Sequence, residues 1–252
     1  MQLKRWIRLK TNIFAHRGAS KYAPENTMPA FQKAYHMNAD GIETDVQLTK
    51  DNIPVLIHDE NVKRTTNSVG LVSKLSYQEL KELDAGSWFS PEFKGIKIPT
   101  LDEFLNWIKD KPLYLNIELK NNKIDYTDIE SIVYQAISNY QLLNRTTIST
   151  FNPNSVKRLK EYSNSLEVAF LTSKRYKSPI RVAKELGANA LHLKYRLLHR
   201  ELVENIHKEN MKLRIYTVNK PVRIMRSFNH QVDGIFTDVP DLAFHYRESV
   251  TD

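Results

Sequence analysis

GIETDV (residues 41–46) is a short apolar segment that carries two acidic residues, Glu43 and Asp45. Residues i and i+2 of a strand face the same side of a sheet, so both carboxylates should point at one spot. LNIELK (residues 115–120) repeats the arrangement with Glu118 and Lys120. Polar residues at the ends of separate strands are how a parallel barrel builds an active site. The two segments therefore favour a barrel with its site at the strand ends.

Short apolar, β-branched runs alternate along the chain with longer amphipathic ones. The repeated strand–helix order predicts an α/β fold of the (β/α)₈ TIM-barrel type. A doubly wound open sheet is the alternative, but no Gly-rich phosphate fingerprint follows the first strand. The predicted strands are residues 12–16, 41–46, 113–119, 146–151, 167–172, 190–195, 213–218 and 234–238.

Helix start and stop signals fall between most of these strands. Thr27 is typical of an N-cap, and further helices are expected after Asn152-Pro153, Ser178-Pro179 and Asn219. Leu186-Gly187 is a plausible helix end, with Gly just past the last turn.

One stretch departs from the alternation of strands and helices. PVLIHD (residues 54–59) follows GIETDV too closely for a helical crossover, so a hairpin through residues 50–52 is expected. Residues 60–100 then form an insertion that contains the capping-box pattern Ser76-x-x-Glu79. We interpret residues 11–247 as a single barrel domain, with residues 60–100 as a lid or side wall of its rim.

The bulk composition narrows the class of protein. The chain has 252 residues, enough for one large domain, and 37 Lys+Arg against 29 Asp+Glu give a net charge of +8. That excess favours anionic partners, and because no nucleic-acid-binding motif is visible, a small phosphate-bearing substrate is expected instead of nucleic acid. The absence of cysteine excludes disulfides, thiolate nucleophiles and Cys-ligated zinc.

The N-terminus, MQLKRWIRLK (residues 1–10), lacks the apolar stretch of roughly 7–15 residues that a signal peptide needs. No run approaches the roughly 18 apolar residues of a membrane span. A cytoplasmic location is therefore expected. Contact of the basic, Trp-containing N-terminus with a membrane surface is an alternative. The oligomeric state is left open.

Three carboxylates at strand ends suggest a metal site. Clustered like charges are unstable unless a cation compensates them or some stay protonated. Oxygen ligands suit Mg²⁺ or Ca²⁺ better than zinc or copper. Glu43, Asp45 and Glu118 are therefore the predicted ligands of one divalent cation, with separate surface salt bridges as the alternative reading.

His16 and His58 each end a strand, in IFAHRG (residues 13–18) and PVLIHD, and each precedes a charged residue. Two imidazoles with pKa values near neutrality can act as acid and base in one turnover. His192 lies within a predicted strand and stays ambiguous. The remaining histidines lie in helical or loop patterns and are interpreted as ordinary surface residues: His36, His199, His207, His230 and His245.

Arg17 and Lys120 complete the candidate site. An Arg fork matches phosphate oxygens bidentately and Lys adds a compact charge, so both are predicted phosphate contacts. Glu25 follows the first strand by a short loop, and its role stays open between contact with substrate or metal and bracing of the loop.

Taken together, these motifs resemble the glycerophosphodiester phosphodiesterase family from about residue 13 to about residue 243. The resemblance implies a (β/α)₈ barrel with a small inserted subdomain. It also implies metal-dependent hydrolysis of glycerophosphodiesters to glycerol 3-phosphate and an alcohol. Its segments are AHRGAS, PENT, ETDVQLTKDNIPVLIHD, RTTN…GLV…LDAGSWFSPEF, IPTLDEFL, NIELK, STFNP, YTVN and DGIFTDVP.

By position, the resemblance assigns every candidate already named. The acid/base histidines would be His16 and His58, and the phosphate contacts Arg17 and Lys120. The metal ligands would be Glu43, Asp45 and Glu118. Tyr216 departs from the pattern, because many members carry Trp there, and this puts contacts to the glycerol or alcohol end in doubt.

Several alternatives remain open at this stage. A lysophospholipase D-like phosphodiesterase would use the basic balance and the aromatic insertion. A non-catalytic phosphate-binding barrel would need neither the histidine pair nor the carboxylates. The preferred head group, the choice between Mg²⁺ and Ca²⁺, and the division of acid and base between the histidines are not decided. Attack by water or by the neighbouring glycerol hydroxyl is equally open.

Overall fold

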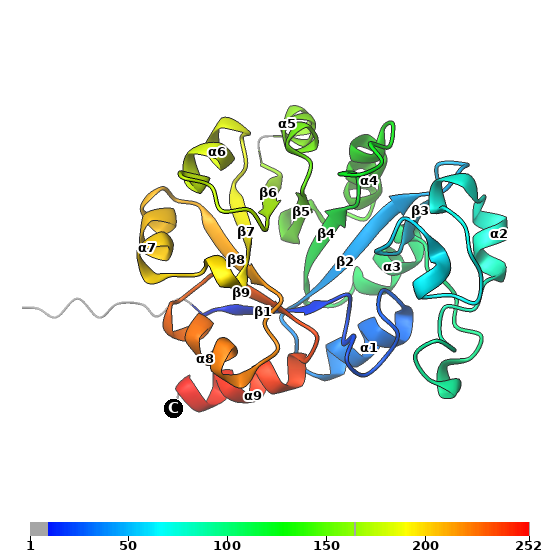
Figure 1. The fold of residues 1–252 in the computed structure, drawn as a ribbon, viewed down its shortest axis with the longest axis horizontal. Helices are drawn as coiled ribbons and strands as arrows, with labels where there is room; N and C mark the ends of the chain where they lie inside the picture. The colour runs from blue at the N-terminus through cyan, green and yellow to red at the C-terminus, as the bar shows by residue number, and fades with distance from the viewer. Residues whose placement is uncertain (1–9, 164, 252) are drawn as a thin grey trace, which may run out of the picture.

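Parallel strands close into a barrel in the computed structural model of the chain, which describes residues 10–163 and 165–251 (Figure 1). β1 pairs in parallel with both β2 and β9, and this double pairing closes the ring. The predicted (β/α)₈ barrel is confirmed and the open sheet is excluded. Its eight strands within the described residues are β1 (Asn12–His16), β2 (Gly41–Leu48), β4 (Tyr114–Leu119), β5 (Thr146–Thr150), β6 (Glu167–Thr172), β7 (Ala190–Lys194), β8 (Lys212–Tyr216) and β9 (Gly234–Thr237).

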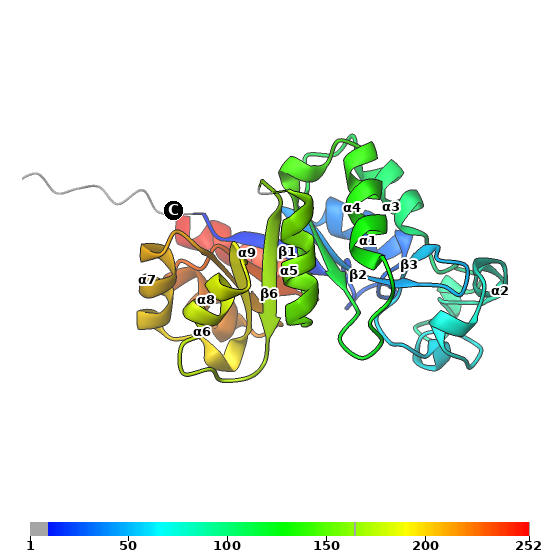
Figure 2. The same ribbon diagram turned by 90° about the horizontal axis from the view of Figure 1, so that it is seen from above.

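Helices surround the barrel and cover the outward faces of its strands (Figures 1 and 2). Large apolar side chains fill the layer between them; Phe31 and Phe104, for example, pack with ring centroids 4.7 Å apart. The helices are α1 (Met28–His36), α2 (Tyr77–Glu82), α3 (Leu101–Ile108), α4 (Ile129–Asn139), α5 (Pro153–Tyr162), α6 (Pro179–Glu185), α7 (Arg200–Lys208), α8 (Pro221–Asn229) and α9 (Pro240–Thr251).

The helix positions are confirmed, but the side chains of three expected start residues do not cap their helices: Thr27, Ser178 and Asn219. The Asn152 side chain caps α5, and α6 ends just before Gly187, whose φ is 81°. Thr27 stands at the N-cap of α1, but its hydroxyl donates to the Pro24 carbonyl instead of accepting from the helix. The helix expected after Asn219 begins at Pro221, because Asn219 bonds to the end of β9 instead.

The predicted hairpin is present. β3 (Pro54–Leu56) runs antiparallel to β2, and Asn52 in the turn takes a φ of 60°. The insertion follows, and its two capping boxes, at Ser76 and Thr100, both form. The segment around α2 lies beside the barrel, beyond β3, in both views (Figures 1 and 2).

No helix in residues 10–163 and 165–251 has the length and apolar character needed to cross a membrane. The membrane contact considered for the N-terminus falls almost entirely on residues 1–9, which lie outside the described residues.

Candidate active site

The three predicted metal ligands meet at the carboxyl ends of adjacent strands. Glu43 and Asp45 lie on β2, and Glu118 on β4 stands in register with Asp45. One carboxylate oxygen from each lies within 4.8 Å of the others. All three side chains are buried, and Glu43 and Glu118 line a cavity. Strand pairing therefore brings together residues that are up to 75 positions apart in sequence.

The pKa values of Glu43 and Asp45 are shifted in opposite directions. Burial and the charge of Asp45 raise the pKa of Glu43 to about 8. Burial would also raise the pKa of Asp45, but Arg17 and Lys120 outweigh it and hold that pKa below its usual range. Asp45 Oδ1 is buried with no hydrogen-bond partner. An oxygen-only donor set with an unsatisfied carboxylate oxygen fits a hard divalent cation such as Mg²⁺ or Ca²⁺.

Arg17 sits in a tight turn directly after β1. It has a φ of 59°, its backbone N–H donates to Glu43 Oε2 at 2.8 Å, and its Nε lies 3.1 Å from Asp45 Oδ2. The turn needs Gly18, because a Cβ there would stand 2.6 Å from the Ala30 backbone. The close approach of α1 thus fixes the arginine against the acidic cluster.

Lys120 follows β4 and approaches the same cluster from the other side. Its Nζ donates to Glu118 Oε1 at 2.7 Å and lies 3.7 Å from Asp45 Oδ1. Burial lowers the pKa of this ammonium group, but the charges of Glu118 and Asp45 outweigh it, so its pKa lies above the ordinary value. Both predicted phosphate contacts therefore stay cationic beside the carboxylates.

His16 ends β1 and is held by a carboxylate from the far end of the chain. Its Nδ1 lies 2.7 Å from Asp238 Oδ1, which directly follows β9. Asp238 is itself fixed by Ser20 Oγ and by the side chain of Asn219. Burial lowers the pKa of His16, but the hydrogen bond to Asp238 and the charge of Glu43 raise it more, so the net shift is upward. Because Nδ1 bonds to Asp238, Nε2 is left to act in the cavity.

His58 has a matching arrangement at the end of the hairpin. Its Nδ1 lies 2.6 Å from Asp59 Oδ1, and Asp59 accepts from Arg64 Nε at 2.6 Å. Each predicted acid/base histidine is thus backed by a carboxylate that orients its ring, an arrangement typical of proton-transferring imidazoles.

A cavity of about 320 Å³ joins these groups. His16, Arg17, Glu43, His58, Glu118 and Lys120 all line it, and Asp45 lies buried next to its Glu43 and Glu118 neighbours. Apolar and aromatic side chains line it as well: Phe151, Leu171, Tyr216 and Phe236. Further polar residues complete the lining: Asn116, His192, Lys194 and Thr217. The cavity therefore combines charged, polar and apolar groups, as sites for small ligands commonly do.

Among the other histidines, His192, which the sequence left ambiguous, also lines this cavity. His192 lies in the barrel interior, with Nε2 3.1 Å from Arg214, and burial with that arginine's charge holds its pKa well below the ordinary value. His199 accepts from the Leu202 N–H at the start of α7, and His207 pairs with Asp233.

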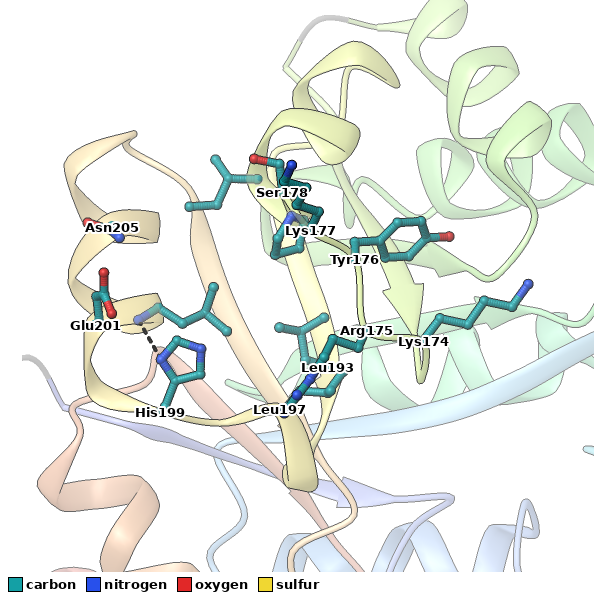
Figure 3. Close-up of a pocket in the computed structure, with 13 residues that line it drawn as sticks. Lys174, Arg175, Tyr176, Lys177, Ser178, Leu193, Leu197, His199, Glu201 and Asn205 are labelled. Carbon is teal, nitrogen blue, oxygen red and sulfur yellow. Dashed lines mark hydrogen bonds between the residues drawn. The ribbon is translucent and has the colours of Figure 1, made fainter.

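A second pocket of about 330 Å³ lies between the β6–α6 loop and α7 (Figure 3). Leu193 and Leu197 line it together with His199, while Lys174 and Tyr176 project away from α7. Glu201 is the acidic residue in its lining, and none of the predicted metal ligands, nor His16 or His58, lines this pocket. The chemistry-bearing residues belong to the smaller, central cavity.

Sequence reasoning missed the residues that hold the site in shape. Asp238, Arg64 and Asn26 were not singled out, yet Asn26 Nδ2 donates to Asp45 Oδ2 at 2.9 Å. Asp238 did carry a usable signal, because it is a polar residue directly after the last strand. Glu25, whose role was open, braces the loop by accepting from Arg17 at 2.8 Å.

Residues 16–242 match the glycerophosphoryl diester phosphodiesterase family. The chain is 42% identical over 233 residues to a glycerophosphodiester phosphodiesterase of Caldanaerobacter subterraneus, covering 92% of this chain and 96% of that protein. A second glycerophosphodiester phosphodiesterase, from Bacillus altitudinis, is 40% identical over 243 residues, with 95% and 99% covered.

Among solved structures, a phosphodiesterase of Oleispira antarctica in complex with the product sn-glycerol-3-phosphate has a TM-score of 0.89 at 28% identity, covering 94% of this chain and 96% of that one. Fold and sequence together define an enzyme of the phosphoric diester hydrolase class. The chain belongs to the glycerophosphoryl diester phosphodiesterase family.

Proposed function

We propose that the protein hydrolyses glycerophosphodiesters to glycerol 3-phosphate and an alcohol, with a divalent cation and two histidines as proton carriers. The observation that carries this proposal is the meeting of three carboxylates, two histidines and two cationic side chains around one cavity. Family membership and the product-bound relative support the choice of substrate class.

Glu43, Asp45 and Glu118 would hold one Mg²⁺ or Ca²⁺. Such an ion, when bound, offsets negative charge on a phosphoryl group. The fit rests on the oxygen-only donor set and on the buried Asp45 oxygen that lacks a hydrogen-bond partner.

Arg17 and Lys120 would bind the phosphate oxygens and stabilise the charge that develops on them during transfer. His16 and His58 would divide the proton work: one deprotonates the attacking hydroxyl and the other protonates the leaving alcohol oxygen. Their carboxylate partners keep Nδ1 protonated, so Nε2 is the nitrogen that exchanges the proton. The attacker is either water or the neighbouring glycerol hydroxyl.

Residues 11–247 would act as a single domain, with the insertion of residues 60–100 forming a side wall. This is supported by its position beside β3 (Figure 2) and by the small apolar cluster that it shares with the hairpin.

The experiment is product identification with purified protein, glycerophosphocholine and either cation. We expect release of glycerol 3-phosphate, and a fall in turnover of roughly 10²–10⁴ for His16→Gln and for His58→Gln, because each removes one proton carrier. His36→Gln, on the exposed face of α1, is the matched control and should turn over like the wild type.

Near-wild-type turnover in both site variants would show that the histidine roles are wrong. Running lysophosphatidylcholine in parallel separates the lysophospholipase D-like alternative, which predicts faster release of choline from the lysolipid. Binding of glycerophosphocholine without turnover, with both cations supplied, would favour the non-catalytic alternative.

A further inference from the structure

Arg64 links the insertion to the active site. It ends a short 3₁₀ helix (Val62–Arg64), and its Nη1 and Nη2 donate to Glu25 Oε2 and Oε1, both at 2.8 Å. Its Nε donates to Asp59 Oδ2 at 2.6 Å, and its Nη2 lies 3.2 Å from Asp59 Oδ1. The planar fork therefore contacts both oxygens of each of two carboxylates, a bidentate geometry that a lysine cannot reproduce.

Each of these carboxylates also contacts a residue of the proposed machinery. Glu25 Oε1 accepts from Arg17 Nη1 at 2.8 Å, and Asp59 Oδ1 lies 2.6 Å from His58 Nδ1. A continuous series of charge-assisted hydrogen bonds thus runs from the loop after β1 to the end of the hairpin. Arg64 is its central member, and it does not line the cavity itself.

The insertion holds the backbone of Arg64 in place. Val62, two residues earlier, is fully buried with Val72 and Leu80 in the apolar cluster of the insertion. The Val62 N–H also donates to the Gly70 carbonyl at 3.0 Å. A side chain carried on such a packed element can fix its partners more precisely than one on a free loop.

We propose that Arg64 is a positioning residue that orients His58 through Asp59 and Arg17 through Glu25. The insertion is then part of the catalytic apparatus as well as a wall beside it. This inference rests on the proposed function for the roles of His58 and Arg17.

The kinetic test compares Arg64→Gln and Arg64→Lys with Lys63→Ala, which removes an exposed cation from the same 3₁₀ helix. With glycerophosphocholine and a divalent cation, we expect kcat to fall about 10- to 100-fold in Arg64→Gln, by analogy with other residues that orient a site from behind. Arg64→Lys should recover only part of kcat, because it restores the charge without the fork. Lys63→Ala should match the wild type.

A double-mutant cycle separates positioning from general destabilisation. If Arg64 acts through Asp59, Arg64→Gln should lower kcat much less in an Asp59→Asn background than in the wild type. The same comparison in a Glu25→Gln background tests the route to Arg17. A loss equal to that in the wild type in both the Asp59→Asn and the Glu25→Gln backgrounds, or near-wild-type kcat in Arg64→Gln itself, would overturn the proposal.

A readout that needs no substrate keeps the test independent of the proposed function. The short bond to Asp59 should give the His58 Nδ1 proton a downfield NMR resonance that His58→Gln removes. We expect Arg64→Gln to shift or broaden this resonance, while Lys63→Ala leaves it unchanged. If the wild type cleaves no glycerophosphodiester, the proposed function is wrong. An unchanged His58 resonance in Arg64→Gln would instead overturn the positioning role.

Discussion

At the scale of single residues, the two proposed proton carriers are oriented in the same way. His16 ends β1 and His58 follows β3, yet each bonds through Nδ1 to one aspartate, Asp238 or Asp59. An aspartate in this place holds the imidazole in one tautomer and stabilises the imidazolium that forms on proton uptake. The two histidines are therefore prepared in the same way, although only one aspartate is adjacent in sequence.

Replacing Asp238 with Asn tests whether this aspartate orients the His16 ring. The amide keeps the shape but loses the charge and can favour the wrong tautomer, so we expect kcat to fall at least ~10-fold with little change in KM. Steady-state kinetics on glycerophosphocholine measures both constants. Asp241→Asn is the control, because Asp241 pairs with the Tyr22 hydroxyl instead of a histidine. Equal kcat in Asp238→Asn and the wild type would contradict the orienting role of Asp238.

The candidate residues that meet at the cavity could be predicted from sequence, whereas most of the residues that contact them were missed. Glu43 and Asp45 are two apart on one strand, so strand periodicity alone places them together. Asp238 reaches His16 only because β9 closes the barrel against β1, a pairing across 222 positions. Arg64 lies in an insertion whose path no local pattern specifies.

At the scale of elements, the positions of the strands were predicted more accurately than the capping bonds of the helices. Short apolar, β-branched runs mark a buried strand directly, and residues 12–16 and 167–172 match β1 and β6 end to end. Capping depends on side-chain geometry: Thr100 caps α3, whereas the Thr27 hydroxyl turns to a carbonyl three residues earlier. The same residue type in the same position can therefore make different bonds.

Ion pairs between strands also hold the end of the barrel opposite the active site. Glu167, at the start of β6, accepts from Arg214 Nη2 on β8 at 2.7 Å and also pairs with Lys212. Burial raises the pKa of Glu167, but Arg214 and Lys212 outweigh it and lower that pKa to about 2.

A folded-state pKa below the unfolded value means that the carboxylate stabilises the protein at neutral pH and that this contribution is lost as pH falls. We expect wild type to exceed Glu167→Gln in the free energy of unfolding by about 2–3 kcal/mol at pH 7. The difference should shrink as pH falls from about 5 to about 2. Urea unfolding across this range measures it.

Glu185→Gln is the matched control, because Glu185 forms an exposed pair with Arg181 on α6 and such pairs contribute little. Its unfolding free energy should follow the wild type at every pH. A difference between Glu167→Gln and the wild type that stays constant down to pH 2 would contradict the assigned charge interaction.

For the molecule as a whole, the barrel explains how distant residues meet. The carboxyl ends of β1, β2 and β4 face one opening, and the hairpin brings His58 to the same place. A net charge of +8 favours an anionic substrate, yet the local cluster is rich in carboxylates. The proposed divalent cation would reconcile the two, because a cation held by the acidic cluster would offset its negative charge and attract phosphate.

The most direct measurement is a titration of chelator-treated protein with Mg²⁺ or Ca²⁺, following heat of binding and turnover of glycerophosphocholine together. The account predicts one ion per chain, turnover that rises with its occupancy, and loss of both signals in Glu118→Gln but not in His36→Gln. Full turnover in the presence of chelator, or undiminished ion binding by Glu118→Gln, would contradict it.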